Sequence, residues 1–238
     1  MIDNRVKEYW NDIDNRLEVL LEKGFVKLPS IKKFDLDSIS KNIKSDMGSL
    51  TFKESCEAHI KFLNNLELQN YLTPKLFNLA KKIFSYKGEL TNQYNIARKV
   101  EPGNSKEMYR AHFDSHLFTL ITPIKIPYSQ DNDKCGELIY FPNLRKNPKN
   151  EFSNIFSKIY YKRYASEIGL KKLSVLHQEK TENFKNYEPL LFLGKTTLHT
   201  NHNVSDSCNT YRLTLLTHFF DDTPKIGVGS LLRFLRRR

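Results

Sequence analysis

Two residue types that bind metals stand two positions apart near the middle of the chain. His112 and Asp114 lie just before a run rich in Leu, Ile, Thr and Phe, and such a run is typical of a β-strand. Alternate residues of a strand share one face, so we expect the imidazole and the carboxylate to point into the same space. A second imidazole would complete the two-His-one-carboxylate set that holds Fe(II) and leaves positions open for oxygen and a co-substrate.

Further groups suited to such a site occur near the end of the chain. His199 follows an apolar, strand-like run that Gly194 interrupts, and Arg212 opens another strand after a polar turn. The guanidinium of an arginine binds a carboxylate through two parallel charge-assisted hydrogen bonds. Thr214 shares strand parity with Arg212, so we expect its hydroxyl beside the same carboxylate.

Four short segments stand in order along the second half of the chain: residues 109–114, Tyr-Arg-Ala-His-Phe-Asp; 136–138, Gly-Glu-Leu; 199–204, His-Thr-Asn-His-Asn-Val; and 212–214, Arg-Leu-Thr. Together they resemble the Fe(II)/2-oxoglutarate-dependent oxygenases, in particular their prolyl-hydroxylase-like and phytanoyl-hydroxylase-like branch. Residues 109–114 resemble the family's Tyr-x-x-His-x-Asp. Residues 136–138 resemble the end of its Gly-Gly-Glu-Leu strand, residues 199–204 its His-x-x-x-Pro-Val, and residues 212–214 its Arg-x-Ser/Thr. Cys135 and Asn203 stand where the family has Gly and Pro. The ordered set is far more specific than any one of its members.

The resemblance implies a metal centre, a co-substrate and an activity. The family binds Fe(II), 2-oxoglutarate and O2, and hydroxylation of an unactivated C–H bond is its default outcome. The metal and the co-substrate carry the difficult step, while the protein supplies geometry and excludes water. By resemblance, the iron ligands are His112, Asp114 and His199, and Arg212 binds the distal carboxylate of 2-oxoglutarate, with Thr214 beside it by strand parity. The family often has a Tyr late in the strand before this motif, where the chain has residues 98–100, Arg-Lys-Val. That contact with 2-oxoglutarate is therefore either lost or supplied by another residue, for which Tyr109 is the candidate.

Two more histidines could compete for the metal. The turn after residue 204 is longer than in the prolyl-hydroxylase pattern, which leaves His202 as an alternative to His199. His116 shares strand parity with Asp114, but the rise of a strand moves it roughly 7 Å away. We therefore expect His116 beside the pocket, as a group that supports the site or faces the substrate.

The resemblance also implies the fold, an α+β domain with a double-stranded β-helix (jelly-roll or cupin-like) core. Residues 93–222 would form this catalytic core, residues 1–92 a helical region that supports it, and residues 223–238 a basic C-terminal tail. An insertion at residues 143–186 contains a helix over residues 151–164 and could cover the mouth of the site as a lid. We expect the aromatic stripe of that helix to be buried, because such stripes usually pack in a core; its members are Phe152, Ile155, Phe156, Ile159 and Tyr160.

Hydrophobic spacing predicts helices and a short strand in the first 92 residues. An amphipathic helix over residues 6–20 ends at Gly24, and its stripe would pack on the domain or form a homodimer seam. A strand follows at residues 24–29, then helices at 35–46, 52–65 and 73–86, the last with Thr73 as N-cap. His59 has no carboxylate at ligand spacing, so we interpret it as a packed or surface histidine.

Composition excludes several classes of protein. Hydrophobic residues make up 39% of the 238 and charged residues 27%, as in soluble globular chains. No apolar run is long enough to span a membrane, and the N-terminus shows no apolar signal region, which predicts a cytoplasmic location. The three cysteines are odd in number and widely spaced, which favours free thiols over a disulfide framework or a zinc site.

The net charge of +11 favours anionic partners. This charge favours an anionic small molecule, a saccharide or a lipid-linked intermediate as substrate. The prolyl-hydroxylase-like features make a peptide a further candidate substrate. The basic tail could touch an anionic membrane surface. Nucleic acid is not expected, because the lysines are spread along the chain without a recognised motif. The alternative function, from a different class, is a non-catalytic cupin-like binding module for an anionic ligand.

Overall fold

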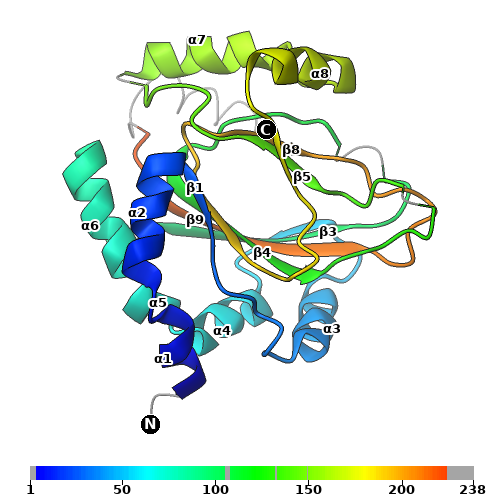
Figure 1. The fold of residues 1–238 in the computed structure, drawn as a ribbon. Helices are drawn as coiled ribbons and strands as arrows, with labels where there is room; N and C mark the ends of the chain where they lie inside the picture. Colours follow the sequence, from blue (N-terminus) through cyan, green and yellow to red (C-terminus); the bar gives the residue numbers. More distant parts are fainter. Residues whose placement is uncertain (1–3, 105–107, 132, 149, 224–238) are drawn as a thin grey trace.

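Two antiparallel sheets face each other at the centre of the molecule (Figure 1). This computed structural model describes residues 4–104, 108–131, 133–148 and 150–223. The large sheet has the strand order β1-β7-β4-β9-β3-β2 and the small sheet the order β6-β5-β8. The jelly-roll fold class is confirmed. The strands are β1 Phe25–Lys27, β2 Phe52–Glu54, β3 Gln93–Val100, β4 His116–Lys125, β5 Leu138–Phe141, β6 Lys180–Glu182, β7 Leu190–Leu193, β8 Leu198–Asn201 and β9 Arg212–Asp221.

Apolar side chains from both sheets fill part of the space between them. Ile121 of β4 and Phe192 of β7 belong to the same buried cluster as Leu138 and Tyr140 of β5. Strand alternation explains this arrangement, because neighbouring residues of β4, such as Phe118 and Leu120, belong instead to the cluster that includes the N-terminal helices. The remaining space between the sheets is a cavity.

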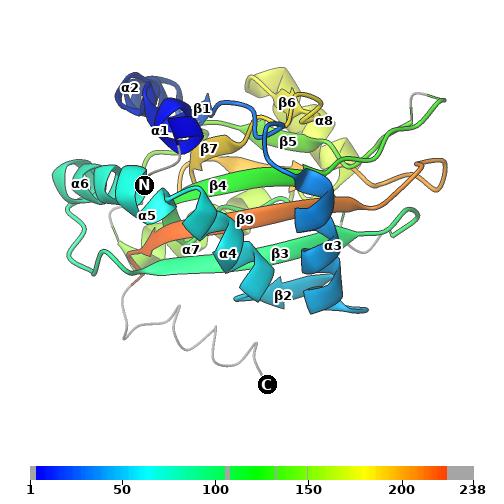
Figure 2. The same cartoon turned by 90° about the horizontal axis from the view of Figure 1, so that it is seen from below.

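The N-terminal helices lie across the outer face of the large sheet (Figure 2). Trp10 anchors this layer, since its indole N–H donates to the carbonyl of Leu66 at 2.7 Å. Gly24 ends the second helix in the left-handed region with φ of 81°, as its position in the sequence predicted. The helices are α1 Asn4–Trp10, α2 Ile13–Lys23, α3 Leu36–Met47, α4 Glu57–Asn65, α5 Leu68–Tyr71 and α6 Thr73–Phe84.

Three sequence-based predictions in this region differ from the structure. The helix predicted over residues 6–20 is two helices, because the chain turns at residues 11 and 12. Residues 52–54 form strand β2 rather than the start of a helix, because they pair with β3 at the edge of the large sheet. Thr73 does not cap α6: Leu72 holds the N-cap position without a side-chain hydrogen bond, and Thr73 is buried in the first turn.

The insertion forms two helices, α7 Glu151–Lys162 and α8 Glu167–Leu176, beside the small sheet and opposite the N-terminal layer (Figure 1). Leu170 and Leu173 of α8 form one buried cluster with residues of β5 and β8. The prediction of a buried aromatic stripe on α7 was wrong, since Phe156 is 70% exposed. The reason is that the opposite, more polar face of α7 turns inward, where Lys158 and Tyr161 line the cavity.

No helix among the described residues is long and apolar enough to cross a membrane. The basic tail predicted for residues 223–238 lies outside the described part of the chain, apart from Thr223.

His59 is the packed histidine that the sequence suggested. Its side chain is buried in α4, with Nε2 3.4 Å from Thr217 Oγ1 on β9. Burial lowers the pKa of His59 to about 3, from an ordinary value of 6.5. The folded chain therefore holds His59 neutral at a pH where the unfolded chain would protonate it.

We predict that His59 makes the fold sensitive to acid. Because its folded pKa is depressed, its contribution to stability is complete above pH 6.5 and is lost as the pH falls towards 3. From pH 7 to pH 5 the wild type should lose about 2 kcal/mol more unfolding free energy than His59→Leu. Urea unfolding of both proteins at each pH measures this difference. Parallel pH dependences would show that His59 does not titrate in this way.

Candidate metal centre

Two histidines that are far apart in the sequence are joined by a pair of backbone hydrogen bonds. His112 N–H donates to His199 O and His199 N–H donates to His112 O, both at 3.1 Å. The pairing is an isolated antiparallel bridge between His199 of β8 and a residue outside the strands, since β4 begins only at His116. His112 and Asp114 therefore precede the strand on which the sequence placed them, and the bridge to β8 orients His112 instead.

Asp114 completes a compact group of three side chains. Its Oδ1 lies 3.5 Å from His112 Nε2 and 3.8 Å from His199 Nε2. The ligand atoms of the three residues all lie within 4.8 Å of one another. His202 is not part of this group of ligand atoms. Its Nδ1 instead lies 3.2 Å from the hydroxyl of Tyr109.

Backbone carbonyls determine which nitrogen of each histidine faces the centre. His112 Nδ1 lies 2.7 Å from Arg110 O, and His199 Nδ1 lies 3.4 Å from Thr197 O. A carbonyl only accepts, so each Nδ1 must carry the proton and donate it. Both Nε2 atoms are then left with a lone pair beside Asp114, as ligation of a metal requires.

The charge states of the buried residues suit a divalent metal. Burial raises the pKa of Asp114, but the imidazoles of His199, His218 and His112 more than offset it and hold that pKa well below its usual range. Burial lowers the pKa of His199 to about 4, with Asp114 acting in the opposite direction. At neutral pH the centre offers an ionised carboxylate and a neutral imidazole at His199, so these residues fit Fe(II).

The second oxygen of Asp114 is held by two residues of the large sheet. Thr119 donates its hydroxyl proton to Asp114 Oδ2 at 2.6 Å. The same hydroxyl oxygen lies 3.0 Å from His218 Nδ1, which must donate to it because the threonine proton is already committed. His218 lies alongside His116, with ring centroids 5.1 Å apart, and both line the cavity. His116 is therefore beside the site, as expected.

Gly194 lets the backbone pass close beneath Asp114. Its carbonyl accepts from Asp114 N–H at 3.0 Å, and its N–H donates to Leu117 O at 2.9 Å. A Cβ at this position would stand 2.7 Å from His116 O and 2.9 Å from Thr119 Oγ1. The glycine that interrupts the apolar run before His199 is thus required by the packing around the carboxylate.

Arg212 lies at the start of β9 with its guanidinium against the small sheet. Nη1 donates to the carbonyl of Gly136 and, at 2.6 Å, to Asn201 Oδ1. Gly136 has φ of 80°, and a Cβ there would lie 3.1 Å from Arg212 Cδ. This position therefore favours glycine for two reasons, its backbone conformation and its close contact with Arg212. Asn201 follows His199 by two residues on β8, which places the guanidinium roughly 7 Å along the strand from that histidine. The five carbons of 2-oxoglutarate can span such a distance.

The other two residues predicted to bind 2-oxoglutarate also line the cavity. Thr214 is buried and follows Arg212 on the inward face of β9, as strand parity predicted. Tyr109 has φ of 52° and its N–H donates to Asn201 O at 3.1 Å. Its hydroxyl contacts His202, the residue after β8, so Tyr109 lies on the wall of the cavity next to the end of that strand.

The cavity of about 1010 Å³ runs from between the sheets to the inner face of α7. This volume exceeds that of many small-molecule sites and leaves room for a second molecule beside a co-substrate. Of the charged residues on its described lining, one is acidic, Asp114, and five are basic: Arg98, Arg110, Lys158, Lys162 and Arg212.

Comparisons with known proteins agree on the fold. No protein-family profile and no curated protein sequence matches the chain. Among solved structures, the non-heme α-ketoglutarate-dependent carbocyclase SnoK from nogalamycin biosynthesis matches with a TM-score of 0.57 at 14% identity, over 92% of this chain and 90% of SnoK. A prolyl 4-hydroxylase from Phytophthora capsici matches with a TM-score of 0.57 at 13% identity, over 99% of this chain and 74% of its own.

A prolyl-4-hydroxylase from Pseudomonas putida matches with a TM-score of 0.52 at 12% identity, over 87% of this chain and 97% of its own. The chain has the fold of these enzymes. At such identities the likeness concerns the fold alone.

Sequence reasoning did not single out the residues that support Asp114. Thr119 lies inside a strand where threonine is common, and His218 shares strand parity with Arg212 but belongs to none of the four motifs. The parity rule contained a usable signal for both, because an inward-facing polar residue on a buried strand needs a partner. Which partner it finds depends on the pairing of β4 with β9, where Thr119 stands opposite His218.

We predict that Thr119→Val weakens metal binding without unfolding the protein. Valine keeps the shape of threonine but leaves Asp114 Oδ2 and His218 Nδ1 without their shared hydroxyl. Loss of an outer hydrogen bond to a ligand should weaken Fe(II) affinity by roughly 10- to 100-fold. Anaerobic Fe(II) titration measures the change.

Thr122→Val is the matched control. Thr122 is buried on the same strand but on the opposite face from Thr119, so its substitution should leave Fe(II) affinity unchanged. Equal affinities for wild type and Thr119→Val would mean that this hydroxyl does not position the carboxylate.

Proposed function

We propose that the protein is an Fe(II)- and 2-oxoglutarate-dependent oxygenase. One observation carries the proposal: two imidazole Nε2 atoms and one carboxylate oxygen converge, with ligand atoms within 4.8 Å of one another. The position of Arg212 on the same cavity supports it. The names of the structural neighbours, an α-ketoglutarate-dependent carbocyclase and prolyl 4-hydroxylases, give further support.

Each residue of the centre has a defined task in this proposal. His112, Asp114 and His199 would hold Fe(II), while Arg212 and Thr214 would bind the distal carboxylate of 2-oxoglutarate. When bound, Fe(II), 2-oxoglutarate and O2 supply the oxidising power to hydroxylate an unactivated C–H bond, with succinate and carbon dioxide as co-products. The chain's own part is to orient these groups and to exclude water.

Tyr109 would form part of the co-substrate wall. Its N–H bond to Asn201 O holds it beside the amide that Arg212 contacts, and its hydroxyl is 3.2 Å from His202. In this role Tyr109 limits the space around the distal carboxylate.

We further propose an anionic substrate, such as a phosphorylated or carboxylated small molecule, a saccharide acid, or a lipid-linked or peptidyl anion. Lys158 supports this choice because it lines the cavity from α7 and makes no ion pair with any described carboxylate. Burial and the nearby Arg145 lower the pKa of Lys158, while Asp114 raises it. An incoming anion would relieve the repulsion between Lys158 and Arg145.

The alternative is a non-catalytic module that binds an anionic ligand in the same cavity. It shares the basic lining but needs neither iron nor turnover. Formation of succinate from 2-oxoglutarate separates the two functions, because only the oxygenase produces it.

We predict that Arg212→Met impairs use of 2-oxoglutarate and leaves metal binding intact. Loss of a bidentate charged pair should raise the KM for 2-oxoglutarate on the order of 100-fold. The readout is succinate formed with Fe(II), O2 and varied 2-oxoglutarate, together with the Fe(II) content of the variant. Lys162→Met removes another cavity cation, at the α7 end, and should leave this KM unchanged. A wild type that binds iron yet forms no succinate would favour the binding module.

We predict that Lys158 determines preference for an anionic substrate. Anionic members of a panel of phosphorylated and carboxylated small molecules should stimulate succinate formation more than their neutral analogues. Lys158→Met should raise the KM of a stimulating anion by roughly 10- to 100-fold, because one charge-assisted contact is lost. The KM for 2-oxoglutarate should not change, and Lys171→Met on the neighbouring helix should resemble wild type. Equal stimulation by neutral analogues would contradict the anionic assignment.

A further inference from the structure

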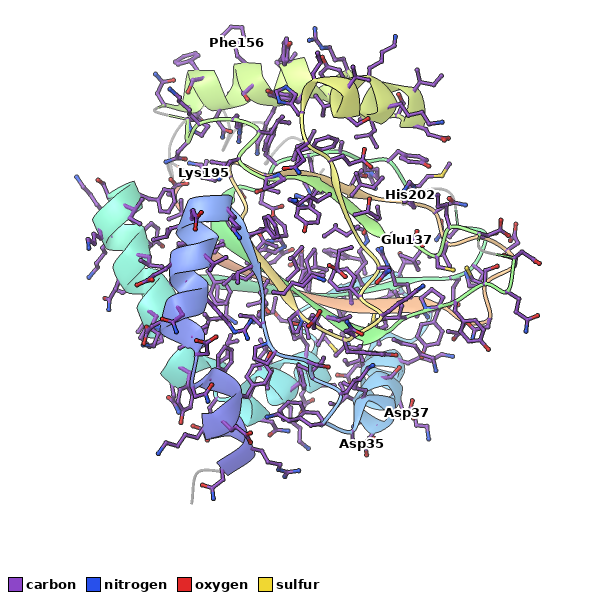
Figure 3. All side chains as sticks on the ribbon, in the orientation of Figure 1. Asp35, Asp37, Glu137, Phe156, Lys195 and His202 are labelled. Carbon is purple, nitrogen blue, oxygen red and sulfur yellow. The ribbon has the colours of Figure 1, made fainter. Side chains whose placement is uncertain are left out.

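The outward face of α7 is apolar. Phe152, Phe156, Ile159 and Tyr160 follow one another at the spacing of a single helix face, and each is at least half exposed. Figure 3 shows Phe156 on the side of α7 that points away from the sheets. The helix buries none of its residues fully, so this face is not part of the hydrophobic core.

The neighbouring helix repeats the arrangement. Leu170 and Leu173 of α8 pack against the small sheet, while Ile168, Val175 and Leu176 are exposed, Val175 by 83%. These three residues share the spacing of the face opposite Leu170. Together α7 and α8 hold seven of the thirteen large apolar side chains that are exposed in the described part of the chain. We call their seven side chains, residues 152, 156, 159, 160, 168, 175 and 176, the α7–α8 face.

Basic residues are interleaved with the α7–α8 face. Arg163 stacks on Tyr160, with its guanidinium carbon 3.7 Å from the ring centroid. Lys171 and Lys172 are exposed between Ile168 and Val175. Arg163, Lys171 and Lys172 are the basic side chains of this face, since Lys158 and Lys162 line the cavity. Apolar side chains with lysine and arginine around them are typical of helices that lie in the interface of an anionic bilayer.

Charge decides among the molecules that could cover this face. A second copy packed symmetrically would bring the basic side chains of two such faces together, which is unfavourable. The C-terminal residues 230–238 are themselves basic and would be repelled in the same way. An anionic bilayer offers both an apolar layer and negative headgroups, so it satisfies both features of the face.

We propose that the α7–α8 face is an interfacial membrane-binding surface for anionic lipid bilayers. Phe156 and Ile159 insert below the headgroups, and Arg163, Lys171 and Lys172 contact the lipid phosphates. The inner face of α7 lines the cavity through Lys158 and Tyr161, so one helix separates the bilayer from the candidate centre. This surface depends on none of the residues assigned to iron or 2-oxoglutarate.

Vesicle co-sedimentation of the full chain tests the proposal. The wild type should bind vesicles of phosphatidylcholine with phosphatidylglycerol, and binding to phosphatidylcholine alone should be weaker. Phe156→Ser with Ile159→Ser should lower the partition coefficient about tenfold or more, because two apolar side chains lose their burial in the bilayer. Leu50→Ser with Ile83→Ser, at exposed apolar residues elsewhere, should bind like wild type.

A second variant distinguishes vesicle binding by the α7–α8 face from vesicle binding by the basic C-terminal residues. Replacement of Arg233, Arg236, Arg237 and Arg238 by Gln should leave the dependence on Phe156 and Ile159 in place. The proposal is overturned if wild type does not bind the anionic vesicles or if Phe156→Ser with Ile159→Ser binds as tightly as wild type. It is also overturned if those two substitutions convert a dimer into a monomer in size-exclusion chromatography, since the face would then join two copies.

Discussion

The candidate centre depends on the two backbone hydrogen bonds between His112 and His199. They join a segment that precedes β4 to strand β8, across 87 positions of sequence, and they set the distance between the two imidazoles. In an antiparallel pair of this kind the two residues exchange both bonds, so their side chains emerge on the same side of the ladder. The sheets, the N-terminal helices and the glycine at 194 serve to keep this pair and Asp114 in register.

Burial of the polar groups of this centre lowers the stability of the fold unless each of them has a hydrogen-bond or ionic partner. Asp114 is buried, yet Thr119 satisfies one of its oxygens and the other faces two imidazoles. The Nδ1 protons of His112 and His199 are donated to backbone carbonyls. The lone pairs of the two Nε2 atoms are therefore left without a hydrogen-bond donor among the described residues. A divalent cation is the partner that this pattern of protonation favours, because it binds lone pairs and offsets the carboxylate charge.

Motif spacing and strand alternation predicted which neighbouring side chains share a face, as for Arg212 and Thr214 on β9, because both are local properties. The resemblance of the ordered motifs predicted that His199 lies close to the His-x-Asp pair, and the ligand atoms of these three residues are grouped in the structure. Long-range pairing was less accessible. The sequence assigned His112 to the strand that becomes β4, whereas a bridge to β8 orients it. In the same way, nothing in the spacing of Cys135 and Cys208 indicated that their sulfurs lie 2.9 Å apart. The aromatic stripe of α7 was misassigned because periodicity reveals that one face is apolar but not whether that face meets the core, solvent or another surface.

The most direct test of this account is the iron content of the purified chain after anaerobic loading with Fe(II). We expect one iron per chain in wild type and in His202→Ala, and almost none in His199→Ala. His202 serves as the comparison because it lies on the same segment, 3.2 Å from Tyr109 and outside the group of ligand atoms. Loss of iron in His202→Ala with retention in His199→Ala would contradict the proposed centre.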